Sequence, residues 1–343
     1  MNEIFASSRV LFARRLCAIA ALAGAALTYG CSSDGAAGAA GSAGATGSTG
    51  AAGSTGSTGA GGSGGTSGTG GLVGTFSVSL KQAVESTMTA AFSQVVGTVY
   101  DGPVPPLLSL VLEREESGCK LLKPRAPFCS PACTSGTVCV EGGQCTPYPK
   151  PQPLGEIRVQ GLGSADVVMA EFPPGFSYQS DALPYPPCDE GGAVRLAASA
   201  FTIETRCVAP LVVADGAIAV TRDQPVKLAW SAPTKPDVAR VQIRLDVSHH
   251  GGKKGEIDCD VPDTGSFEIP SSLVTALVDL GLAGFPTVIV SRVASAKAAA
   301  APNVALDVVA SVEREVDTGV HSCVKDEDCP SGQTCDPNGL TCK

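Results

Sequence analysis

Short runs rich in Val, Ile and Leu recur along the chain between clusters of Gly, Pro, Asp and Ser, and several alternate between apolar and polar positions. In Arg240–Val247, the four apolar residues Val241, Ile243, Leu245 and Val247 occupy every second position. This period of two is typical of half-buried antiparallel strands. The expected strands are Thr75–Leu80, Leu107–Leu112, Glu156–Gln160, Ala193–Ala197, Val226–Trp230, Arg240–Val247, Thr287–Val293 and Val304–Val312.

Two connections also have recognisable patterns. The segment His249–Gly255 is rich in turn residues and joins two strand-like runs, so a β-hairpin is expected there. One short helix is expected at Ser271–Leu280, with Ser271 as its N-cap and Gly281 at its end. Its apolar residues share one face at helical spacing: Leu273, Val274, Leu277 and Val278.

These elements predict a mainly β fold. Short strands at this spacing indicate an antiparallel β-sandwich of immunoglobulin-like shape. We expect a β segment at 72–118 and the sandwich domain at 148–316. Trp230, with Cys207 or Cys259 nearby, is reminiscent of an immunoglobulin core, but the spacings do not match that family closely.

The N-terminus carries an export signal, expected at 1–30. Arg14 and Arg15 precede an apolar run, Leu16–Leu27, which is about half the length that a membrane-spanning helix needs. The run ends at Gly30-Cys31 and resembles bacterial lipoprotein signals, which implies acylation of Cys31 and an outer-membrane or cell-surface location. Thr28 and Tyr29 depart from that family's pattern, so ordinary signal cleavage and secretion is the alternative.

The lipidated cysteine is followed by a low-complexity tract, and together they make up the expected segment 31–71. Glycine recurs at every third position from Gly35 to Gly71, with Ala, Ser and Thr between and neither proline nor charge. The period suggests a collagen-like triple helix, whereas the lack of proline favours a disordered, flexible tether.

Cysteine usage indicates disulfides. Of fourteen cysteines, Cys17 would leave with the signal and Cys31 would carry the lipid, which leaves an even number in an oxidising compartment. Two quartets contain an internal repeat, since Cys133–Cys139 matches Cys329–Cys335 in spacing and in a central Ser-Gly, and they place cysteine-rich modules at 119–147 and 317–343. The first quartet is Cys129, Cys133, Cys139 and Cys145; the second is Cys323, Cys329, Cys335 and Cys342.

The pattern C-x5-C-P-x-G-x-x-C-x6-C at Cys323–Cys342 resembles the small cysteine-rich modules of Dickkopf and EB type. In the second quartet we expect Cys323 to pair with Cys335 and Cys329 with Cys342, one of three possible pairings. The spacings are mostly too long for a zinc site, and the acidic run Asp326–Asp328 lacks the pattern of a calcium loop.

The net charge and the motifs of the chain indicate which classes of function to expect. Removing residues 1–30, whose net charge is +2, changes the formal charge from −9 to −11, so no nucleic-acid partner is expected. The sequence contains no metalloprotease motif, credible nucleophile elbow or C-x-x-C pair, and we predict no catalytic, metal or cofactor residues. His249 and His250 could share a metal in a glycine-rich loop, although a solvated hairpin tip is favoured.

The anchor cysteine, tether, cysteine modules and the segment Asp263–Pro270 together resemble uncharacterised surface lipoproteins of myxobacterial type. That resemblance implies no established activity. We expect a non-enzymatic envelope module that is attached to the membrane by its lipid and has an unknown protein or glycan ligand. The alternative is an extracellular hydrolase of glycan or peptide whose carboxylates the sequence does not locate.

Overall fold

A computed structural model describes residues 71–83, 88–106, 108–248, 252–319, 323–329, 331–336 and 341–342. The chain divides into two compact units, 1–64 and 65–343, and the described residues all belong to the second. The export signal, Cys31 and most of the glycine-rich tract lie outside the described residues.

The largest element is a ten-stranded sheet with the strand order β3-β4-β15-β14-β17-β18-β1-β2-β9, and β12 also pairs with β18. The pairs are antiparallel except that β18 lies parallel to both β1 and β12. The strands are β1 (Val73–Lys81), β2 (Phe92–Tyr100), β3 (Ser109–Glu116), β4 (Cys119–Arg125), β9 (Tyr178–Gln179), β12 (Ile218–Ala219), β14 (Arg240–Asp246), β15 (Glu256–Pro262), β17 (Thr287–Lys297) and β18 (Asn303–Asp317).

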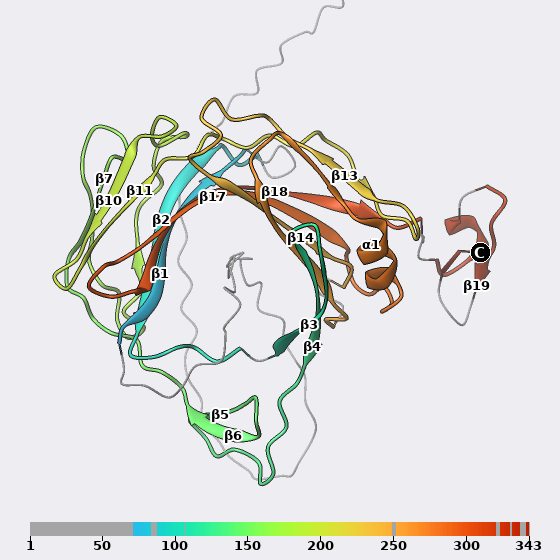
Figure 1. Cartoon of the computed structure of the whole chain (residues 1–343), viewed down its shortest axis with the longest axis horizontal. Coiled ribbons are helices and arrows are strands. Elements are labelled where there is room, and N and C mark those ends of the chain that lie inside the picture. Colours follow the sequence, from blue (N-terminus) through green and yellow to red (C-terminus); the bar gives the residue numbers. More distant parts are fainter. Residues whose placement is uncertain are drawn as a thin grey trace, which may run out of the picture. The chain divides into compact units, whose positions relative to one another are not determined.

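Smaller elements form a second layer on one face of this sheet (Figure 1). A four-stranded sheet has the order β11-β10-β7-β8, β13 pairs with β16, and the helix α1 contacts β15 and β4. Their bounds are β7 (Ile157–Gln160), β8 (Val167–Met169), β10 (Ala193–Ala197), β11 (Thr202–Arg206), β13 (Val226–Ala229), β16 (Ser266–Ile269) and α1 (Ser271–Val278).

Strand alternation explains the core between these layers. Val241, Ile243 and Leu245 of β14 are buried, as expected, and the buried positions of the neighbouring strands continue the same apolar face. At one end of the core the ring centroid of Phe76 on β1 lies 5.8 Å from that of Tyr178 and 6.5 Å from that of Phe201. The opposite face of the ten-stranded sheet is mixed: on β17 it carries Ser291 and Ser295 but also Ile289 and Val293.

The connection between β2 and β3 requires this sheet to curve. The two strands are eighth and first in the strand order, and seven strand spacings would separate them by about 34 Å in a flat sheet. Only residues 101–108 join them, and the nine steps from Tyr100 to Ser109 reach at most about 32 Å. The sheet therefore forms an arch, with the connection across its open side and the second layer on its convex face (Figure 1).

The predicted mainly β, antiparallel sandwich is confirmed, and each of the eight predicted strands overlaps an observed one. The predicted hairpin is also present, since β14 and β15 are antiparallel neighbours. The predicted N-cap was wrong: Ser271 is the first helical residue, and Pro270 occupies the cap position without a side-chain hydrogen bond. Trp230 lies just beyond β13, where it forms an isolated bridge with Val213.

The two cysteine-rich modules are closed by their own disulfides. Cys129 bonds to Cys139 and Cys133 to Cys145, beside the hairpin β5 (Thr137–Val140) and β6 (Gln144–Pro147). In the second module, Cys323 bonds to Cys335 and Cys329 to Cys342, the alternate pairing expected from the sequence. This module contains a 3-10 turn, η2 (Asp326–Asp328), and the strands β19 (Cys335–Asp336) and β20 (Thr341–Cys342).

The expected boundary at residue 119 does not correspond to the structure. Cys119 lies in β4, directly opposite Cys259 of β15, and the two residues form a disulfide across 140 positions of sequence. Because β1 pairs with β18 and β4 with β15, segments 72–118 and 148–316 share one sheet. The first module therefore begins after β4, and Cys188–Cys207 is a further bond within the β body.

We expect the double variant Cys119→Ser/Cys259→Ser to lose about 4–5 kcal/mol of unfolding free energy, because this bond closes the longest loop. Cys188→Ser/Cys207→Ser, whose bond spans 19 residues, is the matched control and should lose about 3 kcal/mol. Urea unfolding followed by circular dichroism measures both. An equal or smaller loss for the first pair would contradict the proposed importance of the long loop.

Candidate functional site

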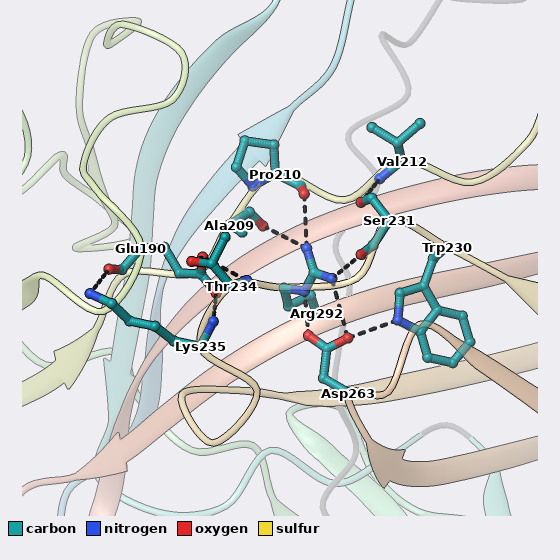
Figure 2. A network of polar contacts seen from close by, with 10 residues as sticks. All are labelled: Glu190, Ala209, Pro210, Val212, Trp230, Ser231, Thr234, Lys235, Asp263 and Arg292. Atoms are coloured by element: carbon teal, nitrogen blue, oxygen red, sulfur yellow. Dashed lines mark hydrogen bonds and ion pairs between the residues drawn. The ribbon is translucent and has the colours of Figure 1, made fainter.

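A charged network centred on Arg292 lies in the core of the described residues. Strand alternation places Arg292 between Val290 and Ala294 on the apolar face of β17, where 1% of its side chain is exposed. Asp263 follows β15 in the turn to β16, and its side chain is also 1% exposed. The Arg292 Nε lies 2.5 Å from Asp263 Oδ2 in a buried ion pair (Figure 2).

Every donor of the guanidinium is used. Arginine has five N–H donors, and five hydrogen bonds leave this side chain. The acceptors are both carboxylate oxygens of Asp263 and the backbone carbonyl oxygens of Ala209, Pro210 and Ser231. Arg292 therefore attaches the loop after β11, the segment after β13 and the turn after β15 to a single strand.

Trp230 completes the coordination of the Asp263 carboxylate. Its Nε1 donates to Asp263 Oδ1 at 2.8 Å, and Arg292 Nη2 donates to the same oxygen at 3.2 Å. The indole is largely buried in the core. A buried tryptophan N–H normally requires such a partner, and here that partner is the carboxylate which also neutralises the arginine.

A second polar contact lies beside this network (Figure 2). Glu190 accepts hydrogen bonds from the hydroxyl and backbone N–H of Thr234 and from the backbone N–H of Lys235, whose Nζ donates back to the Glu190 carbonyl oxygen. Burial opposes ionisation of Glu190, but these hydrogen bonds and the charge of Arg292 outweigh it and hold its pKa below the ordinary value. The contact joins the Cys188–Cys207 loop to the segment after β13.

A buried carboxylate lies at the start of β15. The Glu256 side chain is 0% exposed; Lys253 Nζ lies 2.6 Å from one of its oxygens and Arg244 Nε lies 3.4 Å away. Burial, followed by the nearby charge of Asp258, raises the Glu256 pKa, and the two cations offset this only in part. The ionised form of Glu256 is thus disfavoured in the folded protein relative to water.

The contacts of the Arg292 network are structural in chemical terms. Asp263 has no oxygen without a donor, so it is already occupied as an acceptor by Arg292 and Trp230. A general base needs an oxygen that can reach a substrate proton. The Arg292 network is therefore suited to fixing loops rather than to acid–base chemistry.

The residues singled out from the sequence differ in where they lie and in what they contact. Cys31, His249 and His250 lie outside the described residues. The quartet cysteines are in disulfides, so their sulfurs are not thiolates that could bind a metal. In the acidic run, Asp326 accepts from a backbone N–H of the module, and Asp328 accepts from two others.

Sequence reasoning missed Arg292, Glu190 and the role of Asp263. The signal for Arg292 was present, since one arginine interrupts an otherwise apolar or small-residue run in Thr287–Val293. The sequence shows Asp263 only as the first residue of the segment Asp263–Pro270, with no sign that its carboxylate is buried. Their pairing joins distant turns, which local patterns do not reveal.

Comparisons with known proteins add little. Neither a family model nor a curated protein matches the chain. Among solved structures, the chicken CNTN1 FN1–FN3 domains share 11% identity over 67% of this chain and 85% of that chain, with a TM-score of 0.17. A similarity at that level carries no argument about fold or function.

Replacing Arg292 should strongly destabilise the protein. Arg292→Met removes the partner of a buried carboxylate, and we expect a loss of about 3–5 kcal/mol in urea unfolding. Adding Asp263→Leu should not restore stability, because the carbonyl oxygens of Ala209, Pro210 and Ser231 remain without their donor.

The matched control is Arg125→Met, which removes an exposed ion pair with Glu141 and should cost less than about 1 kcal/mol. Recovery of wild-type stability by the Arg292→Met/Asp263→Leu double variant would show that the carbonyl contacts contribute little.

Glu256 should make a distinctive contribution to the pH dependence of stability. Because its folded pKa is raised, the unfolded chain loses this proton first as the pH rises above the ordinary value of 4.5. Its contribution to the unfolding free energy therefore falls through that window, then becomes constant once the folded carboxyl is also ionised. Glu256→Gln lacks this fall, so its stability relative to wild type should increase with pH over the window.

The exposed Glu268→Gln is the control for this titration. Its stability relative to wild type should change little over the same pH range in parallel urea titrations. If the stability of Glu256→Gln relative to the wild type instead falls as the pH rises above 4.5, the direction assigned to the Glu256 pKa shift is wrong.

Proposed function

We propose that this protein is a non-enzymatic binding or structural module of the bacterial cell envelope, anchored by a lipid at Cys31 and displayed on its glycine-rich tether. The proposal combines the export signal and tether of the sequence with the described β body. Among the described residues, no helix is long and apolar enough to cross a membrane. The proposed attachment to the outer membrane or cell surface thus depends on the acylated cysteine.

One observation supports the non-enzymatic role above all others: the hydrogen-bonding capacity of the Arg292 network is used to join three loops. Arg292 has all five donors engaged, and Asp263 accepts from both Arg292 and Trp230. The six disulfides among the described residues add covalent constraints to the same body and its modules. Such a scaffold suits the presentation of a fixed surface outside the cell.

The hydrolase alternative requires a pair of carboxylates that are free to act on a substrate. The best-buried pairs of opposite charge, Asp263 with Arg292 and Glu256 with Lys253, hold carboxylates that already have cationic partners. This occupancy favours the binding module, and a pull-down from intact cells identifies what the module binds.

The anchor is tested by Cys31→Ala in the full chain. We expect the wild-type protein to fractionate with membranes and to carry the mass of a lipid, whereas the variant should be released into the soluble fraction. Cys17→Ala is the matched control, because this cysteine is expected to leave with the signal and its replacement should not affect anchoring. Membrane retention of the Cys31→Ala variant without a lipid mass shift would overturn the lipoprotein assignment.

A further inference from the structure

We propose that the outer edge of β3 is a self-association surface, at which two copies of this protein pair antiparallel and join their ten-stranded sheets. The inference goes beyond the proposed function and does not depend on it. β3 is the first strand in the order of its sheet and pairs on one side only, with β4. At eight residues it is the longest edge strand of the described sheets.

The outer edge of β3 carries backbone groups that have no partner. Within the described part of the chain, no backbone hydrogen bond joins β3 to any segment except β4. Leu110 lies opposite Pro124, which has no N–H to donate, so the two form the type of opposite pair that exchanges no backbone hydrogen bonds. The N–H and C=O of Leu110 therefore point away from β4, and those of Leu112, two residues farther along, do the same. Such a row of groups is a template for another extended strand.

The side chains of the same two residues are exposed and apolar. Leu110 and Leu112 are 39% and 51% exposed, and they share one face of the strand. Long edge strands in soluble proteins are normally protected by a charge, a proline or a bulge. Residues 109–112 contain none of these, so this half of β3 is an unprotected edge.

The other half of β3 has that protection. All four residues at 113–116 are charged, and a bulge lies between Leu112 and Arg114. Arg114 Nη1 donates to the Ser272 carbonyl oxygen at 3.2 Å, and the Ser272 hydroxyl donates to the Glu116 carboxylate. Because a bulge interrupts regular pairing, an added strand can continue the sheet only along residues 109–112.

The charges near the edge are balanced within one copy. Glu113 lies 3.0 Å from Lys123 of β4, and Glu115 lies directly opposite Lys120. The hairpin of β3 and β4 therefore presents no excess of charge that would select a cationic partner or repel a second copy locally. The apolar half of the edge determines what it accepts.

This half is complementary to itself. When a twofold axis passes through Val111 of two antiparallel β3 strands, Leu110 of each copy lies opposite Leu112 of the other. Both leucines direct their backbone groups outward, so each of these pairs exchanges two hydrogen bonds. The four leucine side chains meet on one face, and the two Val111 residues face each other in a pair without hydrogen bonds. Each copy thus supplies the surface that the other requires, as in an isologous dimer.

Other positions of the axis are less favourable. An axis at Glu113 would oppose the two Glu113 carboxylates and place leucines against charged residues, which is destabilising. An axis at Leu112 would place Leu110 opposite Arg114, beyond the bulge. An axis at Leu110 would pair Leu112 with Leu108, which precedes β3. The axis at Val111 therefore keeps the whole apolar ladder within the strand.

The register is tested by Val111→Cys in the full chain, oxidised mildly and separated on a denaturing gel without reductant. Opposite residues in a pair without hydrogen bonds are close enough for a disulfide. We expect a product of twice the mass of one chain that reductant returns to the monomer, at least about fivefold more abundant than for the control. The control is Val168→Cys, at an exposed position of the short edge strand β8.

Leu110→Cys checks the position of the axis. With the axis at Val111, the two Leu110 residues are diagonal neighbours about 7–8 Å apart, which is beyond the span of an undistorted disulfide. This variant should therefore cross-link no more than Val168→Cys does. Preferred cross-linking of Leu110→Cys over Val111→Cys would overturn the pairing proposed here.

A second measurement uses no added cysteine, which covers the case in which the cysteine variants do not fold. Sedimentation equilibrium of the full chain in mild detergent should show a reversible dimer whose population rises with protein concentration. Leu110→Lys/Leu112→Lys places like charges opposite each other and should raise the dissociation constant about tenfold or more. Val168→Lys, on the edge strand β8, should leave it unchanged. Thermal melting monitors folding of every variant.

The outcomes separate this inference from the proposed function. A wild-type protein that stays monomeric at all concentrations, or a folded lysine variant that dimerises as the wild type does, would overturn self-association at β3. Cross-linking of Val111→Cys to a different envelope protein would overturn the choice of a second copy as the partner. None of these results bears on the lipid at Cys31, which the Cys31→Ala fractionation tests separately.

Discussion

The body of the protein depends on one buried guanidinium. Arg292 belongs to the ten-stranded sheet, but its acceptors lie in three loops that connect elements of the second layer with strands of this sheet. An uncompensated charge in that core would be very costly, so Asp263 and the carbonyl oxygens must be in place together. The network therefore links correct loop geometry to the packing of the whole sandwich. Loss of one loop contact leaves a donor buried among apolar side chains.

Much of the fold could be predicted because alternation is a local property. Val241, Ile243 and Leu245 showed one face of β14, and the same reasoning located seven other strands. Pairing partners were not predictable in this way. The parallel contact between β1 and β18 joins residues more than two hundred positions apart, and the boundary at Cys119 failed because its partner, Cys259, is equally remote.

The same limit applies to the candidate site. The disulfides of the cysteine quartets could be predicted because the bonded cysteines are close in sequence. The acceptors of the Arg292 network, in contrast, are far from Arg292 in sequence. An arginine within an apolar run indicates that a carboxylate should exist somewhere in the core, but not which of the many acidic residues supplies it. Ser271 shows the converse: a favourable cap residue is present, yet Pro270, directly after β16, occupies the cap position and Ser271 is already helical.

The curvature of the large sheet follows from a long-range constraint of the same kind. A short connection between β2 and β3 joins strands that are eighth and first in the strand order, and the second layer covers the convex face (Figure 1). On β17, the face that packs against the second layer is apolar apart from Arg292, whereas the opposite face alternates polar pairs such as Ser291 with Ser311 and apolar pairs such as Val293 with Val309. The charge that β17 buries thus lies between the two layers, so the loops that the guanidinium holds are the loops that connect these layers.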